Sequence, residues 1–125
     1  MDGAKTDFTM RQASAQLGVS VQVLRKYCNN GLVPGLRYTP GRQRIFTVEQ
    51  LDWLRVMVML SRAKFTVKDL RRYLRLGQTG TSEAVQEQRA MLQTHKRQVW
   101  QELEDLQAAI DFIERQEEVL ETGAH

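Results

Sequence analysis

The stretch that decides the fold is Gly18-Val-Ser-Val-Gln-Val-Leu-Arg-Lys-Tyr27, near the start of this 125-residue chain. Its Ser20 is a residue type that caps helices, and apolar residues at positions 21, 24, 27 and 28 mark one face of a short helix that stops by Asn29-Asn30-Gly31. Just upstream, apolar residues at positions 10, 13 and 17 predict another short helix, between the N-cap residue Thr9 and Gly18. Two short helices joined by so tight a turn predict a helix-turn-helix.

A β-hairpin is predicted directly after these helices. Both prolines and three glycines fall between positions 31 and 46, and the segments Leu36-Arg-Tyr38 and Gln43-Arg-Ile-Phe46 flank the turn Thr39-Pro-Gly-Arg42. We expect the rings of Tyr38 and Phe46 to pack within this hairpin. This pattern predicts a short β-hairpin after the two helices.

Two further helices complete the predicted head. Thr47 caps a long helix with apolar residues at three- and four-residue steps, and Lys64-Phe65 breaks it. Thr66 caps a fourth helix, which we expect to end at Gly77, before a linker at 77–81.

Residues 82–121 predict one long helix, because proline and glycine are absent from them. Apolar side chains recur there every seven residues from Val85 to Leu120, and the second seam position is apolar at Leu103 and Ile110 but polar at Arg89, Lys96 and Glu117. So small a head cannot cover so long a helix, and the sequence therefore predicts a coiled-coil homodimer. The predicted interface residues are Val85, Leu92, Val99, Leu103, Leu106, Ile110, Ile113 and Leu120.

The charge is divided between the two halves of the chain. Residues 1–76 hold 14 Lys or Arg and 5 Asp or Glu, a balance of +9, whereas residues 77–125 hold 4 and 10, a balance of −6. A strongly basic head favours phosphate binding, because each neutralised phosphate releases condensed counterions. The acidic half is not expected to touch DNA.

Several classes of protein are excluded by the same composition. No apolar run reaches the length of a membrane span, and the first residues lack the core of a secretory signal, so we expect a cytoplasmic protein. Sequence motifs of enzymes are missing, and a lone cysteine cannot supply the thiolates of a metal site, so we expect neither catalysis nor a metal or other cofactor.

Two groups of side chains are candidates for contact with double-stranded DNA. Polar side chains on or near the exposed side of the second helix can enter a major groove, while its N-terminus meets phosphate. The hairpin has too many arginines for an idle loop, and we expect it to touch the DNA backbone. The predicted contact residues are Ser20, Gln22, Arg25, Lys26 and Tyr27 on the helix, and Arg37, Arg42 and Arg44 on the hairpin.

These motifs, taken in order from about Phe8 to Leu76, resemble the MerR family of winged helix-turn-helix transcription regulators. The resemblance implies that the second helix reads DNA, that Arg44 is the wing arginine, and that the dimer helices are antiparallel. This chain departs from the common family pattern at Gln22 and Lys26, which leaves its base preference open, and in the wing at Gln43. Arg62 and Lys64 are candidates for a second phosphate contact, like the family's second wing; the alternative is an ordinary basic surface.

Other conspicuous residues receive a structural interpretation. We expect Cys28 to be a structural cysteine and His95 to be an interface residue. A basic cluster of three arginines is either a solvated face or a partner for the acidic helix, and two tryptophans could line an apolar ligand pocket, although core packing is the more common role. The arginines are Arg71, Arg72 and Arg75, and the tryptophans are Trp53 and Trp100.

The sequence therefore predicts a mainly α protein: a winged helix-turn-helix DNA-binding domain at 1–76, a dimerisation helix at 82–121 and a tail at 122–125. We expect a homodimeric regulator on an inverted-repeat promoter operator, and the resemblance implies that it distorts the promoter spacer so that RNA polymerase can engage. One alternative is a coiled-coil interaction adaptor with a nonspecific nucleic-acid-binding head, and another is a sensor of a small apolar ligand. The operator, the effector and the sign of regulation are not readable from the sequence.

Overall fold

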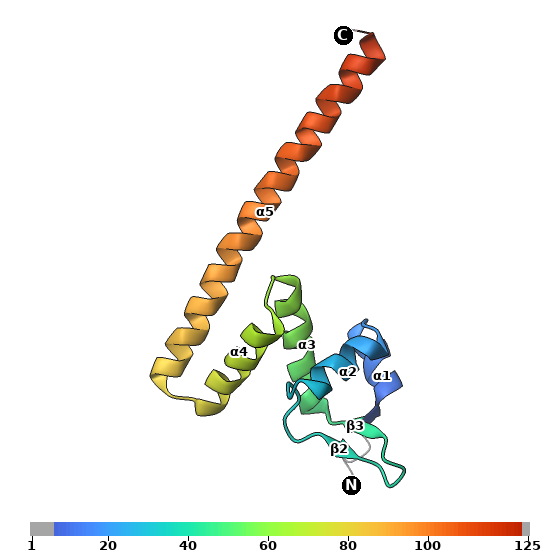
Figure 1. The fold of residues 1–125 in the computed structure, drawn as a ribbon, viewed down its shortest axis with the longest axis vertical. Helices are drawn as coiled ribbons and strands as arrows, with labels where there is room; N and C mark the ends of the chain where they lie inside the picture. Colours follow the sequence, from blue (N-terminus) through green and yellow to red (C-terminus); the bar gives the residue numbers. More distant parts are fainter. Residues whose placement is uncertain (1–6, 124–125) are drawn as a thin grey trace.

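Helices dominate the computed structural model, which describes residues 7–123 (Figure 1). Helices α1 to α4 and a small sheet form a head, from which α5 projects far beyond the rest of the chain. The helices are α1 Met10–Leu17, α2 Val21–Asn29, α3 Val48–Arg62, α4 Val67–Thr79 and α5 Ser82–Thr122, and the strands are β1 Phe8–Thr9, β2 Arg37–Tyr38 and β3 Arg44–Phe46. The prediction of a mainly α chain with a hairpin wing and a long terminal helix is confirmed.

The first four helices begin at the residues predicted to cap them. The side chains of Thr9, Ser20, Thr47 and Thr66 each accept a hydrogen bond from a backbone N–H three residues further on. In α1, α3 and α4 the third residue of the helix returns a bond to the backbone of the cap, which completes a capping box. These local hydrogen bonds fix the residue at which each helix begins, including the first residue of α2.

The sheet contains one strand more than the predicted hairpin. Its order is β1-β3-β2 with antiparallel pairing, and Phe8 of β1 lies opposite Phe46 of β3. Phe46 is fully buried, so the expectation that its ring packs inside is confirmed, whereas Tyr38 is exposed. The added strand ties the wing to the beginning of α1.

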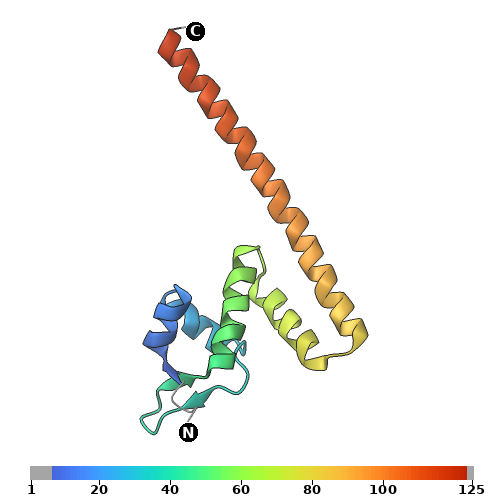
Figure 2. The ribbon, with the colours of Figure 1, turned by 180° about the vertical axis from the view of Figure 1, so that it is seen from behind.

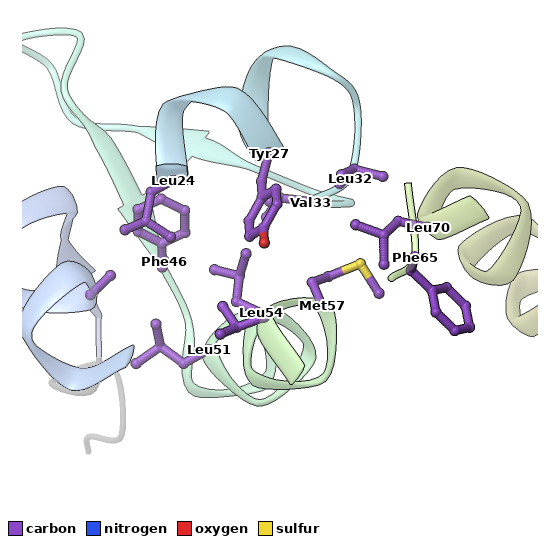
Figure 3. Close-up of a cluster of buried hydrophobic side chains, with 12 residues drawn as sticks. Leu24, Tyr27, Leu32, Val33, Phe46, Leu51, Leu54, Met57, Phe65 and Leu70 are labelled. Atoms are coloured by element: carbon purple, nitrogen blue, oxygen red, sulfur yellow. The ribbon is translucent and has the colours of Figure 1, made fainter. Parts of the chain in front are cut away.

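The core of the head lies between α2, the wing and α3 (Figure 3). Leu24 and Tyr27 project from α2 towards Leu54 and Met57 of α3. The indole N–H of Trp53 donates to the backbone carbonyl of Leu32, 2.7 Å away, and so fixes the chain that leaves α2. Together these contacts hold α2 with one face in the core and the other in solvent.

The end predicted for α4 is wrong, because the helix continues through Gly77 to Thr79 and is capped by Gly80 in a left-handed conformation. A Cβ atom at Gly77 would lie 3.1 Å from the side-chain nitrogen of Gln88 on α5. The same nitrogen donates to the carbonyl of Tyr73 at 3.0 Å. Gly77 therefore permits close packing of α5 on α4, and the expected linker at 77–81 shrinks to two residues.

Helices α4 and α5 lie side by side in both views of the molecule (Figures 1 and 2). His95 of α5 packs its ring on Phe65 with 4.0 Å between centroids, and its Nε2 lies 3.4 Å from Asp69. His95 thus packs against its own head, and the expectation that it is an interface residue stays a prediction. A hydrogen bond from the Thr66 backbone N–H lowers the pKa of Asp69 below its ordinary value, and the nearby His95 contributes a smaller effect in the same direction.

The 41 residues of α5 span about 61 Å at ~1.5 Å per residue, and much of this length projects beyond the head (Figure 1). Seven of the eight predicted interface residues are among the exposed large apolar side chains of the protein: Val85, Leu92, Leu103, Leu106, Ile110, Ile113 and Leu120. Val99 is half-buried. No helix in residues 7–123 has the length and apolar surface that crossing a membrane requires.

Candidate nucleic-acid interface

Helix α2 presents its polar side chains to solvent because its apolar face is anchored in the core. Gln22, Arg25 and Lys26 are exposed, whereas Leu24 is fully buried. At the N-terminus, the side chain of Ser20 accepts from the backbone N–H of Val23 at 3.1 Å. The polar face of α2 and its first turn therefore form one accessible surface.

The wing is tied to the far end of α2 by an arginine. Arg44 of β3 donates from Nη2 to the side-chain oxygen of Asn29, 2.6 Å away. This bond leaves the charge of Arg44 uncompensated, because the amide of Asn29 is neutral. The predicted wing arginine thus both positions the hairpin against α2 and presents a cation beside it.

The tip of the wing adopts a backbone conformation that normally favours glycine. Arg42 has φ 64°, in the left-handed region, and its N–H donates to the carbonyl of Thr39 at 2.8 Å. A three-residue hairpin loop commonly has glycine at such a position. An exposed arginine is found there instead, at a cost in backbone energy, which is typical of a residue kept for its side chain.

A basic groove runs between the helix-turn-helix and the wing. Two adjoining hollows have five lining residues in common, so they form one depression. Its lining contains four arginines and no acidic side chain. The basic groove is lined by Thr9, Met10, Arg11, Val21, Arg25, Tyr38, Thr39, Pro40, Arg42, Gln43 and Arg44. This surface can accept an extended polyanion, and the exposed side of α2 continues from it.

Residues 8–76, more than half of the chain, match the MerR HTH family of regulatory proteins. The chain belongs to the MerR family. It is a transcription regulator of the helix-turn-helix type, and the groove lies in the part of the chain that the family match covers.

Individual relatives are distant. An uncharacterised HTH-type transcriptional regulator of Haemophilus influenzae is 24% identical over 107 residues, which cover 86% of this chain and 78% of the relative. The crystal structure of HiNmlR, a MerR family regulator lacking the sensor domain, bound to promoter DNA, superposes with a TM-score of 0.76 at 24% identity, over 84% of this chain and 79% of that one. A MerR family regulator from Listeria monocytogenes, 23% identical, has the same TM-score over 92% and 86%. At this identity the likeness of the two structures is evidence for the fold alone.

The other predicted wing arginine lies on the opposite face of the MerR-type wing. Arg37 is paired with Ile45, whereas Tyr38 is paired with Arg44, so Arg37 and Arg44 point to different faces of the sheet. The guanidinium of Arg37 binds both carboxylate oxygens of Asp7 at 3.0 Å. Its charge is therefore partly neutralised within the chain, unlike the charges in the basic groove.

A second basic point lies at the turn between α3 and α4, where Arg62 and Lys64 are both exposed. Lys64 has φ 73°, which makes it the second non-glycine residue of the described chain in the left-handed region. Its Nζ lies 3.2 Å from a carboxylate oxygen of Glu102 on α5. Any phosphate at this turn must compete with Glu102 for the ammonium group.

Tyr27 is the predicted contact residue that the structure removes from the surface. It is 5% exposed, and its hydroxyl lies 2.8 Å from that of Ser61 on α3. Ser61 donates to the carbonyl of Met57, so the hydroxyl of Tyr27 is the donor to Ser61. The placement of Tyr27 on the exposed side of α2 is therefore wrong, and the residue belongs to the core.

Two arginines of the basic cluster on α4 bind residues of neighbouring helices. Arg72 pairs with Glu87 of α5, which confirms one of the two roles considered for the cluster. Arg71 instead donates to the backbone and side-chain oxygens of Asn30, both at 3.3 Å, and so reaches the end of α2. Arg75 is exposed. The C-terminal end of α2 is thus held from the wing side by Arg44 and from the α4 side by Arg71.

The remaining conspicuous residues show no sign of a ligand site. Burial raises the pKa of the Cys28 thiol, which disfavours the reactive thiolate and agrees with a structural role. Within residues 7–123 no three His, Cys, Asp or Glu side chains come together as a metal site. Trp53 stacks on Tyr73 inside the head, whereas Trp100 is 59% exposed on α5, so neither residue supports the apolar pocket considered for them.

Arg11 is the groove residue that the sequence reasoning missed. It is exposed on the first turn of α1 and lines the same hollow as Arg25 and Arg44. The signal available in the sequence was a basic residue two positions after the N-cap Thr9, in the first helical turn, where an acidic residue is favoured.

We predict that Tyr27→Phe lowers the free energy of unfolding by about 0.5–1.5 kcal/mol, because it removes one internal hydrogen bond and keeps the ring. DNA affinity should stay close to that of the unchanged protein. Urea unfolding and fluorescence anisotropy with a labelled duplex measure the two quantities. The matched control is Tyr38→Phe on the exposed wing, which should leave stability unchanged; a loss of DNA affinity in Tyr27→Phe without loss of stability contradicts the core assignment.

Proposed function

We propose that this MerR family regulator is a homodimer that binds an inverted-repeat promoter operator, with α2 of each head in a major groove and the wing on the flanking backbone. The basic groove is the observation that carries the proposal, since it joins exposed polar side chains on α2 to a surface for phosphates. HiNmlR, which shares the fold, has been crystallised on promoter DNA.

The chemistry of the exposed α2 side chains suits base edges. A guanidinium such as Arg25 can donate two bonds to the O6 and N7 atoms of guanine, and the amide of Gln22 can pair with adenine. Lys26 can serve either a base edge or a phosphate. Specificity is therefore assigned to this face of α2, with Gln22 and Arg25 as its readers.

We assign contacts with DNA phosphate groups to the basic side chains around this face and to the N-terminus of α2. Arg42 and Arg44 supply the wing contacts, and Ser20 with the first turn of α2 offers backbone N–H groups to a phosphate. The first turns of α1 and α2 contain no acidic residue, whereas those of α3, α4 and α5 each contain one. The two helices that meet the groove thus lack the negative charge that would repel DNA.

The α3–α4 turn is assigned a second, weaker backbone contact through Arg62 and Lys64. The left-handed backbone of Lys64 supports this role for the same reason as at Arg42, because strain there favours keeping a particular side chain. Glu102 competes for Lys64, so the contribution of this turn should be smaller than that of the wing.

We assign the dimer interface to the exposed apolar side chains that recur along α5, since this helix is too long for the head to cover. Charge favours antiparallel pairing about the middle of the segment 99–113. Residues 82–98 hold three basic and two acidic side chains, whereas residues 99–123 hold one basic and eight acidic. Parallel helices would place the acidic segments together, while antiparallel helices bring Lys96 within about one turn of Glu117 of the partner subunit.

Regulation is proposed to follow the family mode, in which the dimer distorts the promoter spacer so that RNA polymerase can engage. That mode depends on DNA deformability, and it places the protein in the bacterial cytoplasm, where promoters lie. The competing proposal is a coiled-coil adaptor whose head binds nucleic acid without sequence preference. The polar seam positions Arg89, Lys96 and Glu117 favour it, since they weaken self-association.

Selection from a random DNA pool at moderate salt, with the solution mass measured alongside, is the direct test. We expect an inverted repeat bound by a dimer of 14.5 kDa chains. Enrichment of no sequence, despite salt-sensitive binding, would support the adaptor, as would a monomeric mass.

Separate variants should distinguish base reading from phosphate binding. We expect Arg25→Ala to cost about 1–3 kcal/mol on the selected operator and to relax the preference at one base pair of each half-site. Arg44→Ala should weaken binding to all sequences and reduce the salt slope by about one unit for each head. Equal, sequence-independent losses in both variants would remove Arg25 from the base-reading role.

A charge swap on α5 should report the direction of the dimer helices. Lys96→Glu and Glu117→Lys should each weaken the dimer by about 1 kcal/mol, because two like-charge contacts replace two attractive ones, and the double variant should recover the loss. Sedimentation equilibrium gives the dissociation constants. In a parallel dimer each of these residues faces its own copy, so the double variant would show no recovery.

A further inference from the structure

We propose that Arg11 on α1 is a further contact to the DNA backbone, so that the phosphate-binding surface of the head extends from the wing across α2 to α1. The inference rests on the proposed DNA binding and deepens it, since it assigns a contact outside the recognition helix and the two turns considered above. Four features of the described chain support it.

The first is position. Arg11 lines the hollow that also contains Val21 and Arg25 from the two ends of the first turn of α2, and Arg44 from the wing. The lining of this hollow comes from α1, from the beginning of α2 and from the wing. A strand of phosphates lying in the groove therefore passes both Arg11 and Arg44.

The second is uncompensated charge. Elsewhere in the described chain arginine has an acidic partner at Arg37 with Asp7, and at Arg72 with Glu87. Within residues 7–123, Arg11 and Arg25 make no side-chain ion pair or hydrogen bond, and Arg44 is bound only to a neutral amide. Four guanidinium groups in one groove repel one another unless an anion with several charges lies between them.

The third is the local cost of the residue. Arg11 is the second residue of α1, at the helix end where backbone N–H groups already present partial positive charge. A cation is disfavoured there, and α1 has no acidic residue in its first turn to balance it. A phosphate in the groove is attracted by both the side chain and the helix end, which removes the local conflict.

The fourth is the shape of the ligand that the groove fits. The arginines come from three separate elements, α1, α2 and the wing, and the exposed reading side of α2 continues from the groove. A single small anion would neutralise only part of such a line of charge. A phosphodiester strand supplies one charge per nucleotide along its length and leaves the base edges towards α2.

The test compares the salt dependence of binding for full-length Arg11→Ala, Arg11→Lys, Arg44→Ala and the unchanged protein. The probes are two fluorescein-labelled duplexes of 30 base pairs, one with the selected inverted repeat and one with a scrambled sequence. We expect Arg11→Ala to reduce the slope of log K against log salt by about 0.9 for each head bound, on both duplexes. Arg11→Lys should retain the slope, because the charge is kept.

The matched control is Arg55→Ala, which also removes an exposed positive charge, but from α3, where Arg55 pairs with Asp52 outside the groove. It should leave the slope unchanged. Thermal unfolding should give Arg11→Ala a melting temperature equal to or above that of the unchanged protein, since a cation leaves the positive end of α1. Weaker DNA binding in a variant that is no less stable excludes misfolding as the cause.

The results separate this inference from the proposed function. A slope for Arg11→Ala equal to that of Arg55→Ala, while Arg44→Ala still flattens the slope, overturns the role of Arg11 and leaves DNA binding intact. Failure of the unchanged protein to bind either duplex overturns the proposed function, and the role of Arg11 with it.

Discussion

The structure of the head depends on the docking of α2 against α3. Leu24 and Tyr27 of α2 meet Leu54 and Met57 of α3, and these apolar contacts are reinforced by the hydrogen bond between Tyr27 and Ser61. Once one face of a nine-residue helix is buried in this way, its other face has only solvent to meet. The direction in which α2 offers its polar residues is thus a consequence of core packing, and the binding surface needs no separate scaffold.

The neighbouring elements add restraint rather than a second core. Arg44 holds one side of the end of α2 and Arg71 holds the other, and both act through polar bonds to an asparagine pair. Arg71 belongs to α4, which packs on α5. The recognition helix is therefore connected by short steps to the helix through which dimerisation is proposed, so the dimer can set how the two reading faces are oriented.

The sequence predicts the features that depend on interactions between neighbouring residues, but it does not predict those that depend on contacts between distant segments. The N-caps at Thr9, Ser20, Thr47 and Thr66 depend on bonds within a few residues, and each lies where the sequence indicated. Strand β1 exists only through pairing with a segment almost forty residues later in the chain, and two residues carry no periodicity. Glycine commonly ends a helix, which is why the sequence predicts the end of α4 at Gly77. In the structure Gly77 lies within α4, where the absence of a side chain leaves room for Gln88 of α5. Tyr27, three residues after Leu24, shares the buried side of its helix, and the periodicity of apolar residues already indicated that side, whereas its polar hydroxyl suggested the exposed one.

The short connection between α4 and α5 makes the long helix a lever. Only Gly80 and Thr81 separate the two helices, and Gln88 and His95 hold α5 against the head about two and about four turns further on, respectively. Over about 61 Å, a tilt of roughly five degrees at this joint displaces the far tip by about 5 Å, which exceeds the rise of one base pair. In the proposed dimer, the distance between the two heads would consequently depend on packing at a joint that lies outside both the proposed DNA interface and the proposed dimer interface. Substitutions at this joint would therefore change the spacing of the two DNA half-sites that the proposed dimer fits, without any change to the exposed face of α2.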